Sequence, residues 1–391
     1  MRRSVVEIVR HCYGPSPNKP KDWMSPTMAA LDHLKKCIGQ RIIVGFDGHK
    51  VPSELLRLDE EWGIGGYLLR KENFSDFEQL MNLNEDLWTR GQGTPPFIGI
   101  SQEGGLVHEV PEPFTVFPEM AHMGQVSSVS VAYEVGAVIG RELTATGFNL
   151  NFAPMLDLNV NTENPTIGRR AISPDPSKVS TLARAVIRGL HDNSIIACGK
   201  YFPGFGDTYY ESDSKLPECK STLEQLREMD VMPYRALIQN PPHLDMVMSG
   251  HVMYPNIDPE HPATYSRAIL HDLLRLEIGF KGLVVTDDLS DPLLNQTVGL
   301  ETAVQRCFES GVDLIKISGP LEQQVQVLEQ ILQIVEKENY PHHMLERSYR
   351  RVRDIKARHF RVLRTIDRQH ARELVGNREH FRIARRLRDG K

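Results

Sequence analysis

The sequence lacks three features that would assign a protein quickly to a class. Its apolar runs stay well short of the ~20 residues that span a bilayer, which excludes an integral membrane segment. Acidic side chains outnumber basic ones by 51 to 46, and the net charge of −5 argues against nucleic acid as a partner. Glu7 and Arg10 interrupt the apolar run that a signal peptide would need. We therefore expect a cytoplasmic protein.

Cysteine is also scarce. The five cysteines are scattered, odd in number and without CxxC spacing, which is typical of reduced, buried thiols rather than of disulfides or a zinc site. The chain also shows no phosphate-binding glycine loop and no cluster of histidines and cysteines at ligand spacing. We expect neither a metal nor an organic cofactor.

The chain does contain a regular alternation of short apolar runs and segments with helical periodicity. Runs that are apolar on both faces, each followed by a helix, predict a parallel sheet covered by helices. Eight repeats predict a closed (β/α)₈ barrel of the TIM type, and a doubly wound open sheet is the alternative. The eight runs are Arg41–Phe46, Gly65–Leu69, Phe97–Ile100, Asn149–Ala153, Ile195–Gly199, Asp245–Ser249, Leu283–Thr286 and Val312–Ile317.

Polar residues favour the barrel over the open sheet. They follow the ends of many different runs, whereas an open sheet would gather them at one switch point. They include Ser101, Asp157, Lys200, His251, Asp287, Asp288 and Ser318.

The flanks differ from this central region. We expect an N-terminal extension over residues 1–37, the barrel over 38–340 and a basic helical extension over 341–391. Residues 11–26 are rich in proline and predict a loop. The basic helices either pack beside the barrel, form a subunit contact in a homodimer, or bind an acidic partner or membrane surface.

One loop carries a family resemblance. Lys200-Tyr-Phe-Pro-Gly-Phe-Gly-Asp-Thr, followed by Asp213-Ser-Lys-Leu-Pro217, resembles the acid/base loop of family 3 glycoside hydrolases, in the bacterial β-N-acetylhexosaminidase branch. Five more motifs are similar and stand in the family's order. They are Glu103-Gly-Gly, Asn151-Phe-Ala-Pro-Met-Leu-Asp157, Asn164-Pro-Thr-Ile-Gly-Arg-Arg170, Met248-Ser-Gly-His251-Val and Gly279-Phe-Lys-Gly-Leu-Val-Val-Thr-Asp287-Asp288. The resemblance covers residues 38–320 and implies a single barrel that hydrolyses a β-linked glycoside.

The resemblance also implies roles for particular residues. Asp287 matches the family's nucleophile, although an aspartate here could instead cap the next helix or pair with a cation. Lys200 and Arg170 match positions that hold sugar hydroxyls; the alternative for Lys200 is an ion pair with Asp157 or Asp287. His251 is either a wall of the site or a satisfied core histidine. The predicted substrate-binding set is Lys200, Arg170, Ser101, Asp157, His251 and Tyr201.

The acid/base loop departs from the family pattern. Tyr201, Phe205 and Asp213 stand where that branch has histidine, and Glu211 stands where it has the aspartate that orients the catalytic histidine. A protonated carboxylic acid can serve as a general acid when its surroundings raise its pKa. We therefore predict Glu211 or Asp213 as the acid/base. Ser101 stands where the family has a sugar-binding aspartate, which changes the sugar that fits.

Three functions remain open from the sequence. The first is a retaining glycosidase that acts on a β-linked glycoside such as an N-acetylhexosaminide, with Asp287 as nucleophile. The second is a catalytically reduced barrel that binds a saccharide or a protein partner without turnover. The third, an aldolase-like barrel with Lys200 as a Schiff-base lysine, leaves five of the six motifs unexplained.

Overall fold

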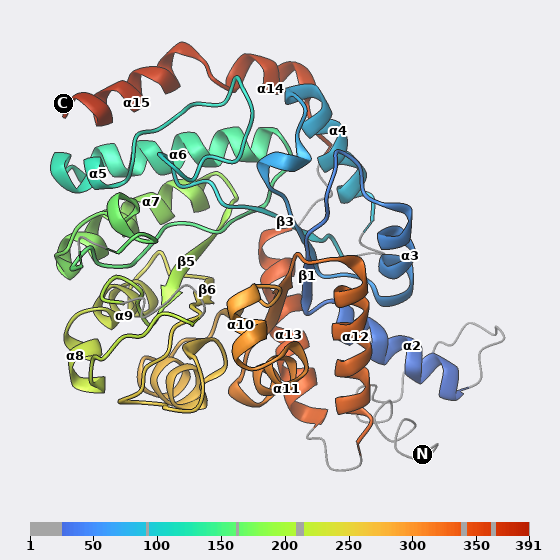
Figure 1. Cartoon of the computed structure of the whole chain (residues 1–391). Coiled ribbons are helices and arrows are strands. Elements are labelled where there is room, and N and C mark those ends of the chain that lie inside the picture. Colours follow the sequence, from blue (N-terminus) through green and yellow to red (C-terminus); the bar gives the residue numbers. More distant parts are fainter. Residues whose placement is uncertain are drawn as a thin grey trace.

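Eight parallel strands close into one barrel in the computed structural model of the protein, which describes residues 26–90, 94–161, 164–208, 215–337, 342–360 and 365–390 (Figure 1). The first and last strands pair in parallel, with Ile43 opposite Lys316, so the sheet has no free edge. The predicted barrel is confirmed, and the open sheet is excluded. The strands are β1 (Ile42–Val44), β2 (Gly66–Leu68), β3 (Phe97–Ile100), β4 (Leu150–Asn151), β5 (Ile196–Phe202), β6 (Met246–Ser249), β7 (Leu283–Asp288) and β8 (Leu314–Ile317).

Helices follow the strands along the chain. The longer ones present one apolar stripe to the strands, as the helical spacing of their apolar residues requires. Asp175 and Ser128 cap two of them by accepting hydrogen bonds from backbone amides of the first turn. The α-helices are α2 (Pro26–Gly39), α3 (Ser53–Trp62), α4 (Phe77–Trp88), α5 (Ala121–Val126), α6 (Val129–Ala145), α7 (Pro176–Asp192), α8 (Leu223–Glu228), α9 (Val231–Gln239), α10 (Pro292–Thr297), α11 (Leu300–Ser310), α12 (Leu321–Val335), α13 (His342–His359), α14 (Arg368–Leu374) and α15 (Arg378–Asp389).

Shorter irregular turns complete the connections. The 3₁₀ helices are η1 (Lys71–Asn73), η2 (Gly168–Arg170) and η3 (Ala263–Tyr265), and η4 (Ala268–Glu277) is a π-helix. None of the helices in the described ranges is long and apolar enough to cross a membrane.

The apolar core has two layers, as a filled barrel requires. The larger layer lies between the strands and the surrounding helices. The smaller one fills the barrel itself with alternate residues along the strands, including Phe97 of β3 and Phe152 directly after β4, and it takes in Val352 and Ile355 of α13. Helix α13 therefore closes the barrel at the end where the strands begin, and the opposite end is left for polar groups.

The basic C-terminal helices pack against the barrel. On α13, Arg351 binds Asp313 and Arg358 binds Asp245. Helices α14 and α15 lie beside α4, α5 and α6 at the top of Figure 1, where Arg372 pairs with Glu78. This packing corresponds to the first of the predicted alternatives for these helices. The division into three segments stays a prediction, and the predicted loop at residues 11–26 lies almost wholly outside the described residues.

Candidate active site

Three charged side chains form the top layer of the barrel interior. Each stands two positions after the last apolar residue of its strand that points into the barrel. They are Lys200 on β5, Asp287 on β7 and Lys316 on β8. Cys198 lies beneath them: burial raises the pKa of its thiol to about 12, and the charges of all three act on it. The alternation of the strands thus brings a carboxylate and two ammonium groups together at the open end of the barrel.

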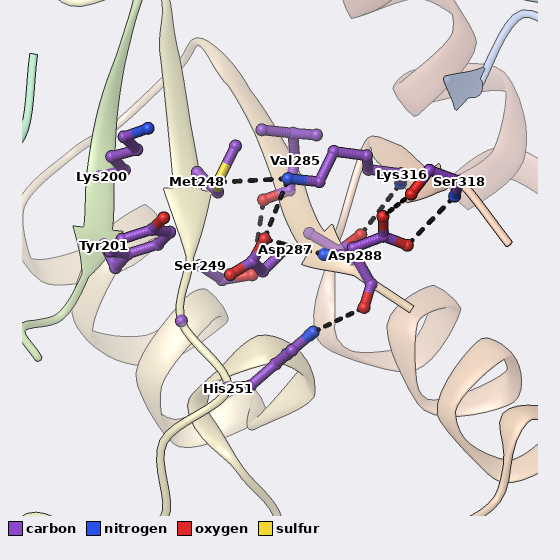
Figure 2. A network of polar contacts seen from close by, with 12 residues as sticks. Lys200, Tyr201, Met248, Ser249, His251, Val285, Asp287, Asp288, Lys316 and Ser318 are labelled. Atoms are coloured by element: carbon purple, nitrogen blue, oxygen red, sulfur yellow. Dashed lines mark hydrogen bonds and ion pairs between the residues drawn. The ribbon is translucent and has the colours of Figure 1, made fainter. Parts of the chain in front are cut away.

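Asp287 is held by an ion pair that the sequence reading missed. Its Oδ1 lies 2.9 Å from Nζ of Lys316 and accepts the backbone N–H of Asp288 at 2.8 Å (Figure 2). Burial by itself raises the pKa of Asp287, but the positive charges of Lys316 and His251 outweigh it and hold this pKa well below its ordinary value. Asp287 is therefore a carboxylate at neutral pH, and its side chain is still 26% exposed.

Lys200 and Arg170 bind the same buried carboxylate, Glu103. Nζ of Lys200 lies 2.7 Å from Oε1 of Glu103, and Arg170 donates through Nη2 at 2.8 Å and through Nε at 3.1 Å. Burial raises the pKa of Glu103, and the two cations more than reverse this, so its pKa lies below the ordinary value. The alternative predicted for Lys200 named Asp157 or Asp287 as its partner; the partner is Glu103.

The turn after Glu103 depends on two glycines. Gly104 and Gly105 both have positive φ angles, 114° and 60°, which residues with a side chain rarely adopt. A Cβ atom on Gly105 would stand 2.6 Å from Cγ of Glu119. Two glycines are thus needed for the chain to turn sharply behind Glu103.

The ring of Tyr201 lies among these cations. The guanidinium carbon of Arg170 is 5.8 Å from the ring centre and Nζ of Lys200 is 5.6 Å from it, within the range of cation–π attraction. Arg170 also donates to the Tyr201 hydroxyl at 3.5 Å. Figure 2 shows Lys200 and Tyr201 on β5, facing the region where Asp287 lies.

Asp157 anchors the start of the predicted acid/base loop. Its Oδ2 accepts the N–H of Tyr201 at 3.0 Å, and its Oδ1 accepts the N–H of Phe205. The residue is 1% exposed, and burial raises its pKa to about 7 against the opposing effect of these two amides. Asn164 holds the same loop by donating to the carbonyl of Phe205 at 2.8 Å. Asp157 thus positions the loop, and its predicted contact with substrate stays a prediction.

His251 supports the strand that carries the carboxylate. Its Nε2 lies 3.0 Å from the carbonyl of Asp288, and since a carbonyl only accepts, this nitrogen carries a proton. Its Nδ1 contacts the hydroxyl of Thr264 at 2.5 Å. His251 is 5% exposed and fully partnered. Asp288 turns away from the barrel axis and accepts hydrogen bonds from Ser290 and Ser318.

Three predicted site residues remain: Ser101, Glu211 and Asp213. Ser101 directly follows β3 and is partly buried at the mouth. Glu211 and Asp213 lie outside the described residues, so their predicted acid/base role stays a prediction. Within the described ranges, no group of three or more His, Cys, Asp or Glu side chains is arranged to hold a metal ion.

Two residues that the sequence reading left without a role therefore matter here, Lys316 and Glu103. Lys316 could have been found from the alternation on its strand, because it stands two positions after the inward Leu314. The pairing of Glu103 with Lys200 and Arg170 had no local signal, since 67 positions separate Glu103 from Arg170.

Comparisons with known proteins agree with this fold. The profile "Glycosyl hydrolase family 3 N terminal domain" matches residues 34–355. The chain is similar to a β-hexosaminidase of Idiomarina loihiensis, with 32% identity over 76% of this chain and 90% of the relative. It is also similar to one of Neisseria meningitidis, with 34% identity over 65% of this chain and 71% of the relative.

Solved structures show the same likeness. A family 3 β-N-acetylglucosaminidase from a Paenibacillus species superposes with a TM-score of 0.83 and 32% identity, over 91% of this chain and 68% of that one. NagZ from Neisseria gonorrhoeae, in complex with N-trifluoroacetyl-D-glucosamine, gives 0.73 and 25% over 90% and 97% of the two chains. The resemblance seen in the six motifs is confirmed: the chain belongs to glycoside hydrolase family 3.

Proposed function

We propose that this protein is a retaining glycosidase that hydrolyses β-linked N-acetylhexosaminides, with Asp287 as its nucleophile. The observation that carries the proposal is the state of Asp287, an ionised and partly exposed carboxylate at the open end of the barrel. A retaining enzyme needs such a carboxylate below the anomeric carbon. The relatives named β-hexosaminidase and β-N-acetylglucosaminidase support the choice of sugar.

The other side chains suit the recognition of a sugar. Among the described residues, Nζ of Lys200 meets one acceptor, Glu103, so it keeps N–H bonds for sugar hydroxyls. Arg170 is 15% exposed and lies beside the Tyr201 ring. We propose that Lys200, Arg170 and Tyr201 line the subsite of the sugar that is attacked, with Ser101 at its edge.

In the proposed reaction, Asp287 attacks the anomeric carbon while the bond to the leaving oxygen breaks. The carboxylic acid of Glu211 or Asp213 gives its proton to that oxygen. Water then attacks the glycosyl-enzyme and gives a proton back to the same residue, which releases the sugar and restores the Asp287 carboxylate. We further propose that the protein is cytoplasmic and forms a homodimer.

The nucleophile is tested with a panel of nitrophenyl β-glycosides. We expect wild type to cleave the N-acetylhexosaminide best, and Asp287→Ala to reduce turnover by several orders of magnitude with little change in folding. Far-UV circular dichroism and the melting temperature provide the folding control. An unchanged rate in Asp287→Ala would place the nucleophile elsewhere. A wild type that binds the sugar but cleaves none of the panel would favour the binding-only barrel.

The acid/base is tested with two leaving groups. A nitrophenolate leaves with little protonation, so Glu211→Ala and Asp213→Ala should both still cleave the aryl glycoside. The variant that has lost the donor should fail on a natural disaccharide. With the aryl glycoside, which still forms the glycosyl-enzyme, azide should speed its turnover by attacking that intermediate. If both variants match wild type on both substrates, neither residue is the acid.

A further inference from the structure

Lys316 is placed where its charge has one strong partner among the described residues. Its side chain is 9% exposed, and Nζ lies 2.9 Å from Oδ1 of Asp287. The other groups around Nζ are the sulfur of Met248 at 3.8 Å and the ring of Phe152, whose centre is 5.4 Å away. A thioether and a ring face attract an ammonium group only weakly. The Lys316 ammonium group therefore depends on Asp287.

The dependence runs in both directions. Burial lowers the pKa of Lys316, and the charges of Asp287 and Asp288 reverse this and raise it to about 12. Removing Asp287 would leave the Lys316 ammonium group with the charge of Asp288, and removing Lys316 would leave the Asp287 carboxylate with that of His251, so each would lose its nearest counter-charge. The pair is therefore ionised on both sides across the neutral range.

The hydrogen bonds to Asp287 are unevenly shared between its two oxygens. Oδ1 accepts from Lys316 and from the backbone N–H of Asp288 at 2.8 Å, whereas no described residue donates to Oδ2 (Figure 2). The Asp288 amide is part of the strand and the Lys316 ammonium comes from the next strand, so the two donors fix the carboxylate from different directions. Two donors on one oxygen leave the lone pairs of the other available.

We propose that Lys316 is a positioning residue for the nucleophile, which holds Oδ1 of Asp287 so that Oδ2 is the atom that attacks the anomeric carbon. This inference rests on the proposed function of Asp287. When Oδ2 forms the ester bond, Oδ1 becomes the ester carbonyl oxygen and stays beside the ammonium group. When water attacks, the bond between the anomeric carbon and Oδ2 breaks and the electron pair returns to the carboxylate. Lys316 stabilises that returning charge.

The test measures Asp287 directly and does not depend on turnover. With ¹³C-labelled aspartate, the carboxyl resonance of Asp287 is assigned by its absence from Asp287→Asn. In wild type we expect the Asp287 carboxyl group to stay ionised down to about pH 4, the ordinary titration midpoint of an aspartate. In Lys316→Met, which keeps most of the length of the side chain without its charge, the midpoint should rise above that value because burial is then opposed by less positive charge.

Three further variants make the result specific. Lys316→Arg keeps the charge and should keep the low midpoint. Lys316→Gln keeps a neutral donor, should give an intermediate midpoint and replaces Lys316→Met if that variant does not fold. Lys356→Met is the matched control: Lys356 is 1% exposed at the other end of the barrel, and its loss should leave the Asp287 midpoint unchanged.

A kinetic readout separates this inference from the proposed function. The acidic limb of the pH profile of kcat/KM should move to higher pH in Lys316→Met, by the same amount as the titration midpoint. If the midpoint rises but wild type cleaves no glycoside, the action of Lys316 on Asp287 holds and the glycosidase function fails. If wild type cleaves glycosides while Lys316→Met changes neither midpoint nor limb, the role of Lys316 is overturned and the function stands.

Discussion

The two ends of the barrel each contain a buried lysine next to a phenylalanine ring, and their surroundings differ in one respect. At the mouth, Lys316 lies 5.4 Å from the ring centre of Phe152 and pairs with Asp287. At the closed end, Lys356 of α13 lies 4.7 Å from the ring centre of Phe97. Its hydrogen-bond acceptors there are neutral: the side-chain oxygen of Gln40 and the carbonyl of Gly65, both at 2.8 Å.

This difference sets the charge of each lysine. Burial lowers the pKa of both side chains. At Lys316 the nearby carboxylates reverse the effect and raise the pKa to about 12, whereas at Lys356 the charge of Asp59 does not, and the pKa falls to about 7. The comparison shows that the charge of the partner, rather than the depth of burial, decides whether a buried lysine remains an ammonium ion here.

The largest effect on stability is expected where two cations share one buried carboxylate. Glu103→Gln would leave Lys200 and Arg170 without their counter-charge, so we expect a loss of about 3–5 kcal/mol in the free energy of unfolding, measured by urea denaturation. Asp313→Asn is the matched variant at the closed end, because Asp313 is fully buried between Arg275 and Arg351.

Both variants should lose stability to a similar degree, but only Glu103→Gln should raise KM for an aryl glycoside. Equal KM values in the two variants would show that the mouth cations do not bind the sugar.

A smaller effect is expected for Lys356. Its folded pKa of about 7 lies below the unfolded value of about 10.4, so the folded state binds fewer protons than the unfolded state between these values. Its contribution to stability is therefore complete above the unfolded pKa and is lost as pH falls toward 7. Between about pH 7 and pH 9 the wild type should gain up to about 1.4 kcal/mol per pH unit from this group.

Lys356→Met should remove that gain, as measured by denaturation at several pH values. If Lys356→Met keeps the wild-type dependence of the free energy of unfolding on pH, another group causes that dependence. The contrast between the pKa values of Lys356 and Lys316 would then be weakened.

The smallest effect is expected for Asp230, a buried acid whose pKa, like that of Lys356, is shifted by burial in favour of the neutral form. Asp230 is 7% exposed beneath Gly204 of the predicted acid/base loop; burial and the charge of Asp207 raise its pKa to about 6. Since this folded pKa exceeds the unfolded value, its contribution is complete below about pH 4 and is lost as pH rises through 6. The melting temperature should fall over this interval by a few degrees, and less in Asp230→Asn. An identical fall in both proteins would contradict this assignment.

Much of the fold follows from the sequence alone. All eight apolar runs became strands of the barrel, because strands that are apolar on both faces can be buried only between a filled interior and a layer of helices. Two strands run past their predicted ends, β5 to Phe202 and β7 to Asp288. The added residues include polar ones, Lys200 and Tyr201 in β5 and Asp287 and Asp288 in β7, and pairing with the neighbouring strands extends both strands over them. The hydrophobicity pattern of the sequence does not predict this extended strand pairing.

The motifs of the sequence determined the family and pointed to Asp287, Lys200 and Arg170, because short runs of residues carry that information locally. Only the tertiary structure decided which charges meet. Glu103 binds Lys200 and Arg170, and Lys316 binds Asp287, across 29 to 97 positions of chain. The closure of the barrel makes these pairs neighbours, and a buried charge is stable only beside such a partner. The sequence thus determined which charged residues stand at the strand ends, and the closed barrel determined the partner and the ionisation of each.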